Sequence, residues 1–89
     1  MNYRVFWSPD AELHFEELIH SFPSETALLT SAAKAIDSKL LSDPHDFGES
    51  RFENLRVGFT QPLAVLIEVM EDVRTVIVID VWRIDQAQK

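Results

Sequence analysis

The sequence of 89 residues contains no cysteine. This absence excludes disulfide bonds, thiolate catalysis and zinc sites built on cysteine, and it suits a reducing cytoplasm. Only two glycines and four prolines occur, which excludes collagen-like and low-complexity chains. No apolar run approaches the ~18 residues of a membrane span, and no apolar run follows a basic start as in a secretory signal. We therefore expect one cytoplasmic domain spanning residues 1–89, with no membrane segment.

Positive charge is also scarce. Fifteen acidic residues against eight lysines and arginines give a formal net charge of −7. A nucleic-acid-binding domain is usually basic, because neutralising phosphates dominates its affinity. We therefore do not expect the overall charge of the chain to attract nucleic acid. A local cluster of basic residues remains possible. The arginines in the C-terminal part of the chain are Arg51, Arg56, Arg74 and Arg83.

The N-terminal part predicts a strand followed by two helices. Residues 3–7 are rich in aromatic and branched side chains, which favour a strand. Ser8 can cap a first helix with Pro9 at its first position, and Ser24 can cap a second helix after Pro23. Two helices separated by so short a break form a helical hairpin. Their apolar stripes are Ala11, Phe15, Leu18, Ile19 and Phe22, then Leu29, Ala33, Ile36 and Leu40.

The C-terminal part predicts a sheet. Residues 51–57 read as a weaker strand and residues 58–62 as a turn. Residues 63–69 and 75–82 are apolar at nearly every position, which is typical of central strands covered on both faces. A five-residue hairpin loop, 70–74, separates them. The order strand, helix, helix, strand, strand, strand predicts an α+β domain, with the helical hairpin packed on one face of a mostly antiparallel sheet.

The second face of this sheet is predicted to be apolar and uncovered. Two helices can cover only one face, and residues 84–89 are too short to add much cover. An apolar half-sheet is therefore left for a partner protein or for a second copy of the chain. In one of the two possible orientations Val76, Val78 and Trp82 share that open face. The alternative is a sheet curled enough to hide this face in a small barrel-like roll.

Several local motifs appear in a recognisable order. Residues 3–11 form a strand that leads through a short polar segment into a helix, and residues 40–44 with Gly48 read L-x-x-D-P…G. Residues 62–65 and 74–83 complete the pattern with C-terminal strands. In this order and spacing, over nearly the whole chain, the sequence resembles the RelE/ParE toxin superfamily of bacterial toxin–antitoxin systems. The resemblance implies a RelE/ParE-like fold and a small toxin neutralised by an antitoxin that wraps around it.

The two branches of this superfamily differ in activity. RelE-like members cut messenger RNA on the ribosome, whereas ParE-like members block DNA gyrase. The ribonuclease branch implies basic residues where this chain has Glu53 and Asn54, and an arginine where it has Pro62 or Ala64. Arg83 matches a basic position after the last strand, but no tyrosine follows it. The resemblance therefore implies a toxin component or a diverged relative that acts by binding protein, with a gyrase-like target resting on the family alone.

Two other functions stay open. The first is a ribosome-dependent endoribonuclease that uses Arg51, Arg56 and Arg83, because such chemistry needs cations aimed at the phosphate and a group that transfers a proton. The second is a non-toxic dimeric interaction module. The same arginines could instead pair with neighbouring carboxylates. Among these are Glu49, Glu53 and Asp80.

Trp82 and Arg74 are the candidate binding residues. A tryptophan beside a strand end is a common anchor of protein interfaces, and Arg74 lies in a loop where its charge is solvated. No cofactor is expected. No metal is expected either, because His45 with Asp43 and Asp46 lacks a fourth ligand and is typical of turn chemistry.

Overall fold

The sheet has five strands in the order β1-β5-β4-β3-β2. In the computed structural model, which describes residues 2–84, β1 pairs in parallel with β5 and all other neighbours are antiparallel. The α+β class and the mostly antiparallel sheet are confirmed, and the two most apolar strands, β4 and β5, are central. The elements are β1 (Arg4–Trp7), α1 (Pro9–Ser21), η1 (Pro23–Glu25), α2 (Thr26–Ser42), η2 (Pro44–Asp46), β2 (Glu49–Phe52), β3 (Leu55–Thr60), β4 (Leu63–Met70), η3 (Glu71–Val73) and β5 (Thr75–Arg83).

The two helices begin in different ways. The hydroxyl of Ser8 accepts a hydrogen bond from the backbone N–H of Ala11 at 3.0 Å, so the predicted cap of α1 is confirmed. The predicted cap of α2 by Ser24 is wrong, because η1 takes up the residues from Pro23 to Glu25 and α2 starts at Thr26 without a side-chain cap. Proline fixes φ and favours such a tight turn directly after the first helix.

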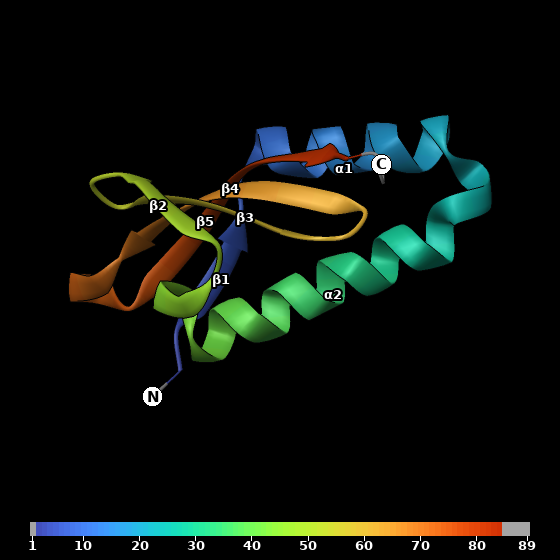
Figure 1. Cartoon of the computed structure of the whole chain (residues 1–89). Coiled ribbons are helices and arrows are strands. Elements are labelled where there is room, and N and C mark those ends of the chain that lie inside the picture. The colour runs from blue at the N-terminus through green and yellow to red at the C-terminus, as the bar shows by residue number, and fades with distance from the viewer. Residues whose placement is uncertain (1, 85–89) are drawn as a thin grey trace.

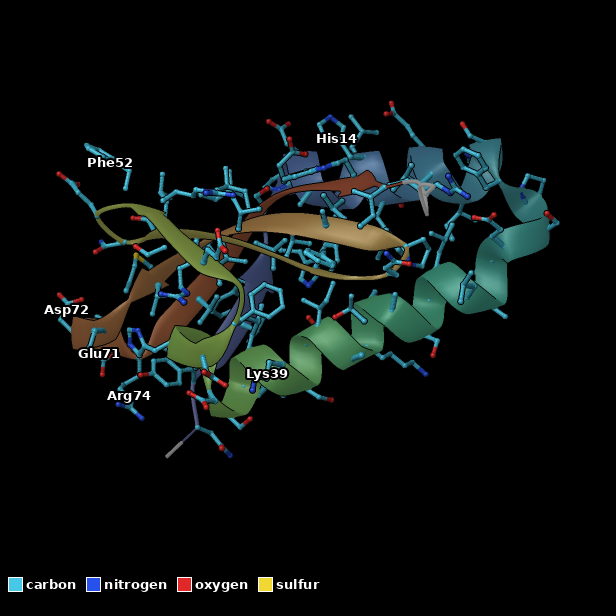
Figure 2. All side chains as sticks on the ribbon, viewed as in Figure 1. His14, Lys39, Phe52, Glu71, Asp72 and Arg74 are labelled. Carbon is cyan, nitrogen blue, oxygen red and sulfur yellow. The ribbon has the colours of Figure 1, made fainter. Side chains whose placement is uncertain are left out.

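The weak strand predicted over residues 51–57 is in fact a hairpin. β2 and β3 are joined by Glu53 and Asn54, with Phe52 paired to Leu55, and Phe52 projects from the hairpin at the end away from α2 (Figure 2). Glu53 has a φ of 51°, a left-handed conformation that glutamate rarely adopts. The turn residues Glu53 and Asn54 include no glycine and no asparagine-glycine pair, which are the usual sequence signals for a tight hairpin turn. The hairpin could therefore not be recognised from the sequence.

The turn predicted over residues 58–62 is shorter than expected. β3 continues to Thr60, and only Gln61 and Pro62, joined by a cis peptide, connect it to β4. Gly58 lies inside β3, where a Cβ atom would stand 2.5 Å from the ring of Phe47. This glycine permits close packing within a strand and does not mark a turn.

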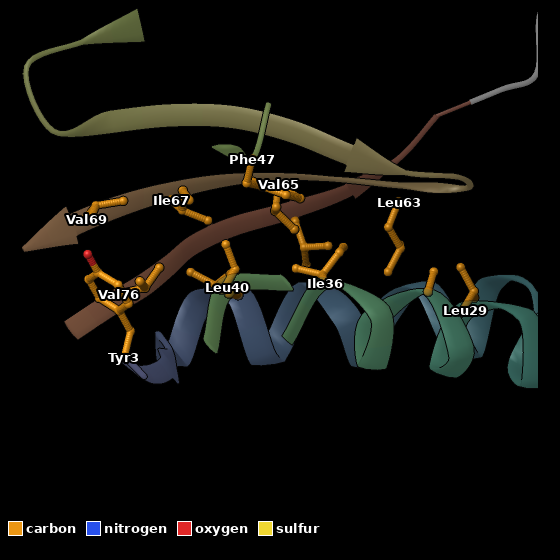
Figure 3. Close-up of a cluster of buried hydrophobic side chains, with 14 residues drawn as sticks. Tyr3, Leu29, Ile36, Leu40, Phe47, Leu63, Val65, Ile67, Val69 and Val76 are labelled. Atoms are coloured by element: carbon orange, nitrogen blue, oxygen red, sulfur yellow. The ribbon is translucent and has the colours of Figure 1, made fainter. Parts of the chain in front are cut away.

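The core lies between the sheet and the helices. Figure 3 shows Ile36 and Leu40 of α2 directed at Val65 and Ile67 of β4, and Leu29 facing Leu63 at the start of the same strand. All six side chains are buried. The predicted stripe of α1 contributes to the same cluster through buried Ala11 and through partly buried side chains. The latter are Phe15, Leu18, Ile19 and Phe22. Both helices thus serve one apolar core on one face of the sheet.

The helices are placed differently on that core. α2 lies across the sheet, whereas α1 runs beside the C-terminal part of β5, beyond the end of the short strand β1 (Figure 1). Ser8 ties this junction, because its N–H donates to Val78 O at 2.9 Å and its hydroxyl donates to Ile79 O at 2.9 Å. Neither helix of the described region is long and apolar enough to cross a membrane.

A bulge in β5 decides which residues face the helices. Val76 and Val78 are buried on the helix side, whereas Trp82 lies on the other face. The expectation that these three residues share one face is wrong, because the register shifts between Leu66 and Ile67 and leaves Ile79 without a partner in β4. One extra residue reverses the alternation along the rest of a strand.

Candidate protein-binding surface

The face of the sheet opposite the helices is mainly apolar and is open within residues 2–84. Phe6 on β1, Phe59 on β3 and Trp82 on β5 keep 52%, 63% and 39% of their surface exposed. The strand register sets Phe59, Ala64 and Trp82 side by side in one row. The next row contains Phe6, Ile77, Glu68 and Leu55, so one half-buried carboxylate interrupts it. The sheet does not curl into a roll that would hide these rings. Residues 85–89, which were expected to add little cover, lie outside the described residues.

Trp82 borders a groove at the edge of this face. The groove has a volume of ≈ 390 Å³ and is lined by α1 and β5, including His14, Asp80 and Trp82. The carboxylate of Asp80 contacts α1, where it hydrogen-bonds His14 Nδ1, and it also accepts a hydrogen bond from the N–H of Val81. The hydrogen bond that His14 donates to the Asp80 carboxylate raises the pKa of His14. Trp82 is thus presented beside a fixed polar pair, which suits an anchor residue of an interface.

Two of the predicted catalytic arginines are held far apart. Arg83 donates from Nε and Nη2 to the two carboxylate oxygens of Glu25, each at 2.9 Å, and its guanidinium lies 4.3 Å from the centre of the Phe22 ring. This hydrogen bonding lowers the pKa of Glu25. Arg83 is paired across the sheet with Leu63 and Arg56 with Ile67. Four residues of strand separate these positions by about 13 Å, so the structure does not bring the two guanidinium groups together.

Arg56 and Arg51 also have partners within the chain. Arg56 donates to the carbonyl oxygens of Phe47 at 2.8 Å and Gly48 at 3.1 Å, and so fastens the loop before β2. Arg51 forms an exposed ion pair with Glu49 at 3.5 Å, one of the carboxylates that the sequence suggested. Exposed pairs of this kind stabilise a fold only weakly.

Arg74 belongs to a side-chain cluster that the sequence reasoning missed. Its Nη1 donates to Glu71 Oε2 at 2.9 Å, and its guanidinium lies 4.2 Å from the centre of the Tyr3 ring. The hydroxyl of Tyr3 donates to Glu71 Oε1 at 2.6 Å, and His45 Nε2 lies 2.7 Å from the same oxygen. Figure 2 shows Glu71 and Arg74 together at this end of the sheet. Arg74 therefore packs on Tyr3, whereas the sequence placed it in solvent.

The cluster has a marked effect on its carboxylate. Hydrogen bonds from His45 and Tyr3, with the charge of Arg74, lower the pKa of Glu71 to about 2. The same Glu71 carboxylate raises the pKa of Tyr3. The four side chains contact one another and connect the residue before β1 with η2 and with the turn at η3, which makes the cluster a structural tether. No signal in the sequence could have located it, because Tyr3 and Glu71 are 68 residues apart.

Comparison of the sequence with family models and with curated proteins found no match. Comparison with solved structures did. The chain superposes on a chain of the RelBE2 toxin–antitoxin complex from Mycobacterium tuberculosis with a TM-score of 0.76 at 16% identity, covering 93% of this chain and 92% of that one.

A second similar structure comes from the chromosomal ParDE toxin–antitoxin system of P. aeruginosa. Its TM-score is 0.73 at 11% identity, and the match covers 93% of this chain and 97% of that one. The fold is RelE/ParE-like. At this low identity the RelE/ParE-like likeness concerns the fold, and the function must be argued from the surface.

Proposed function

We propose that this chain is a RelE/ParE-like toxin component, or a diverged relative of one, that acts by binding another protein in the bacterial cytoplasm. The observation that carries the proposal is the open apolar face of the sheet, with Phe6, Phe59 and Trp82 exposed on it. Exposed apolar surface of this kind marks protein interaction sites. The RelE/ParE-like fold supports an antitoxin as one partner, because the two solved structures described above belong to toxin–antitoxin systems.

The state of the arginines favours binding over ribonuclease activity. Stabilising a phosphate in a transition state requires cations aimed at a common point and free to contact it. Arg83 is engaged by both oxygens of Glu25, and Arg56 by two backbone carbonyl groups. Recruiting either arginine would first require breaking these contacts. A gyrase-like target is one form of the proposal and rests on the fold alone.

Induced expression in a bacterial host separates the mechanisms. We expect the wild-type protein to stop growth without cleaving messenger RNA. Arg51→Ala, Arg56→Ala and Arg83→Ala are expected to remain toxic, provided that their circular dichroism matches that of the wild type. Cleaved messenger RNA that disappears in these variants would establish the ribonuclease. Harmless expression at a high level would favour the non-toxic dimeric module.

The partner can be sought beside the gene. We expect a neighbouring reading frame to encode a small protein that restores growth when it is co-expressed. Purified together, the two proteins should form a complex that protects the open face, as measured by hydrogen exchange of β1, β3 and β5. Rescue of growth without a complex would count against direct neutralisation.

A further inference from the structure

A second recess lies between the helices, on the other side of the molecule from the open face. It has a volume of ≈ 360 Å³, within the range of about 300–1,000 Å³ typical of ligand clefts. Its apolar part consists of Trp7, Phe15 and Ala33. Its polar part consists of Glu12 and Glu16 on α1 and Asp37 on α2. We call this recess the helix groove.

The carboxylates of the helix groove form no ion pair with any residue in the range 2–84. None of the ion pairs among the described residues involves Glu12, Glu16 or Asp37. Asp37 accepts the indole N–H of Trp7 at 2.8 Å, and neither lysine of α2 lines the groove. Glu12 and Glu16 are one helical turn apart, so their like charges repel. Within residues 2–84 no group of side chains is arranged to hold a metal ion.

At two other places in this chain, an aromatic ring beside a carboxylate binds an arginine side chain. Arg83 lies over the ring of Phe22 and pairs with Glu25, and Arg74 lies over the ring of Tyr3 and pairs with Glu71. In both places a guanidinium group fits between an aromatic ring and a carboxylate. Arginine suits this setting because its planar guanidinium group can stack on the ring while its N–H groups donate hydrogen bonds to the carboxylate.

The helix groove repeats that setting without an arginine of its own. The rings of Trp7 and Phe15 meet edge to face with their centres 5.8 Å apart, and three carboxylates border them. We propose that the helix groove binds an arginine side chain presented by a segment of a partner protein. The net charge of −7 would attract such a basic segment from a distance. This inference concerns a surface other than the open face and does not require the protein to be toxic.

A random-peptide library displayed on phage provides the probe, with the folded full chain as bait. We expect the recovered peptides to contain arginine and to lose about tenfold or more in affinity when that arginine becomes glutamine. The same loss should follow from the E12Q/E16Q/D37N variant of the protein. E12Q/E16Q, which keeps the Asp37–Trp7 hydrogen bond, guards against a folding defect and should lose affinity in the same direction.

The matched control removes the same number of charges elsewhere. D43N/E49Q/D72N neutralises three exposed carboxylates outside the groove and should bind the peptides as the wild type does. Nuclear magnetic resonance adds a local readout, because the chain has two tryptophans and the indole N–H of Trp7 should shift more than that of Trp82. Recovery of no peptides, peptides without arginine, equal losses in both triple variants, or a shift confined to Trp82 would each overturn the proposal.

Discussion

At the scale of single residues, the two glycines of this chain each serve a specific close approach. Gly58 leaves space for the ring of Phe47 within β3. Gly48 has a φ of +61°, and a Cβ atom there would stand 2.1 Å from the carbonyl oxygen of Val57. The loop before β2 therefore depends on the absence of a side chain at Gly48, in a left-handed conformation that other residues rarely adopt.

Replacing Gly48 should destabilise the fold. We expect Gly48→Ala to lower the free energy of unfolding by roughly 1–3 kcal/mol, because backbone strain of this kind costs that much before the clash with Val57 is counted. Urea denaturation measures the difference. Ser50→Ala, at an exposed position in the adjacent strand, is the control and should have little effect. Equal stability of Gly48→Ala and the wild type would contradict the need for a glycine.

The Glu71 cluster should give the protein a distinctive acid sensitivity. The pKa of Glu71 is lowered from 4.5 to about 2, so its contribution to stability is fully present above pH 4.5 and is lost as the pH falls toward 2. Glu71→Gln should remove this part of the pH dependence. Thermal unfolding followed across that range compares the two proteins, and parallel curves would show that Glu71 contributes nothing through its charge.

The residue scale also marks the limit of sequence reasoning. Ser8, Pro9 and the apolar stripes act through neighbours within a few residues, so their roles could be predicted. The ring that contacts Arg74 and the carboxylate that pairs with Arg83 could not, because Tyr3 and Glu25 come from distant parts of the chain. Only the fold brings these long-range partners together.

At the scale of elements, α2 supplies the principal cover of the sheet. Ile36 is fully buried, whereas Leu28 on the same helix is 52% exposed. We expect Ile36→Ala to lower the free energy of unfolding by about 2–5 kcal/mol, because a large buried side chain is replaced by a cavity. Leu28→Ala should stay within about 0.5 kcal/mol of the wild type. Similar losses for the two variants in urea denaturation would contradict this placement of α2.

The contact between α1 and β5 should respond to alkaline pH. The Asp80 carboxylate raises the pKa of His14 above its ordinary 6.5. The resulting stabilisation is fully present below pH 6.5 and is lost as the pH rises through the raised pKa. His14→Gln should lose this dependence on pH while keeping a polar side chain at the site. Unfolding free energies of the two proteins that change in parallel with pH would contradict an ionic contact.

Most elements could be predicted, and the exceptions share a physical cause. Amphipathic stripes and continuous apolar runs located both helices and the two central strands, because burial governs those positions. The hairpin at Glu53 and the bulge at Ile79 escaped prediction, since each depends on backbone conformation and pairing with a neighbouring strand. The bulge matters for the candidate surface, because it places Trp82 on the open face.

At the scale of the whole molecule, the RelE/ParE-like fold leaves one face of its sheet open. One core serves both helices and one side of the sheet, and the other side keeps its aromatic residues exposed. Because this protein is acidic, we expect a partner to recognise the apolar surface of the open face and not a positively charged patch on it. The account therefore depends on the open face being the surface through which the protein acts.

Growth of a bacterial host after induced expression tests that dependence most directly. Phe6→Lys/Phe59→Lys places charge on the open face, and Leu13→Lys/Leu28→Lys changes residues of similar exposure, 51% and 52%, on the helices. With all three proteins folded by circular dichroism, the account predicts that the wild type and the helix variant stop growth and that the open-face variant does not. Arrest by all three proteins, or by none, would contradict it.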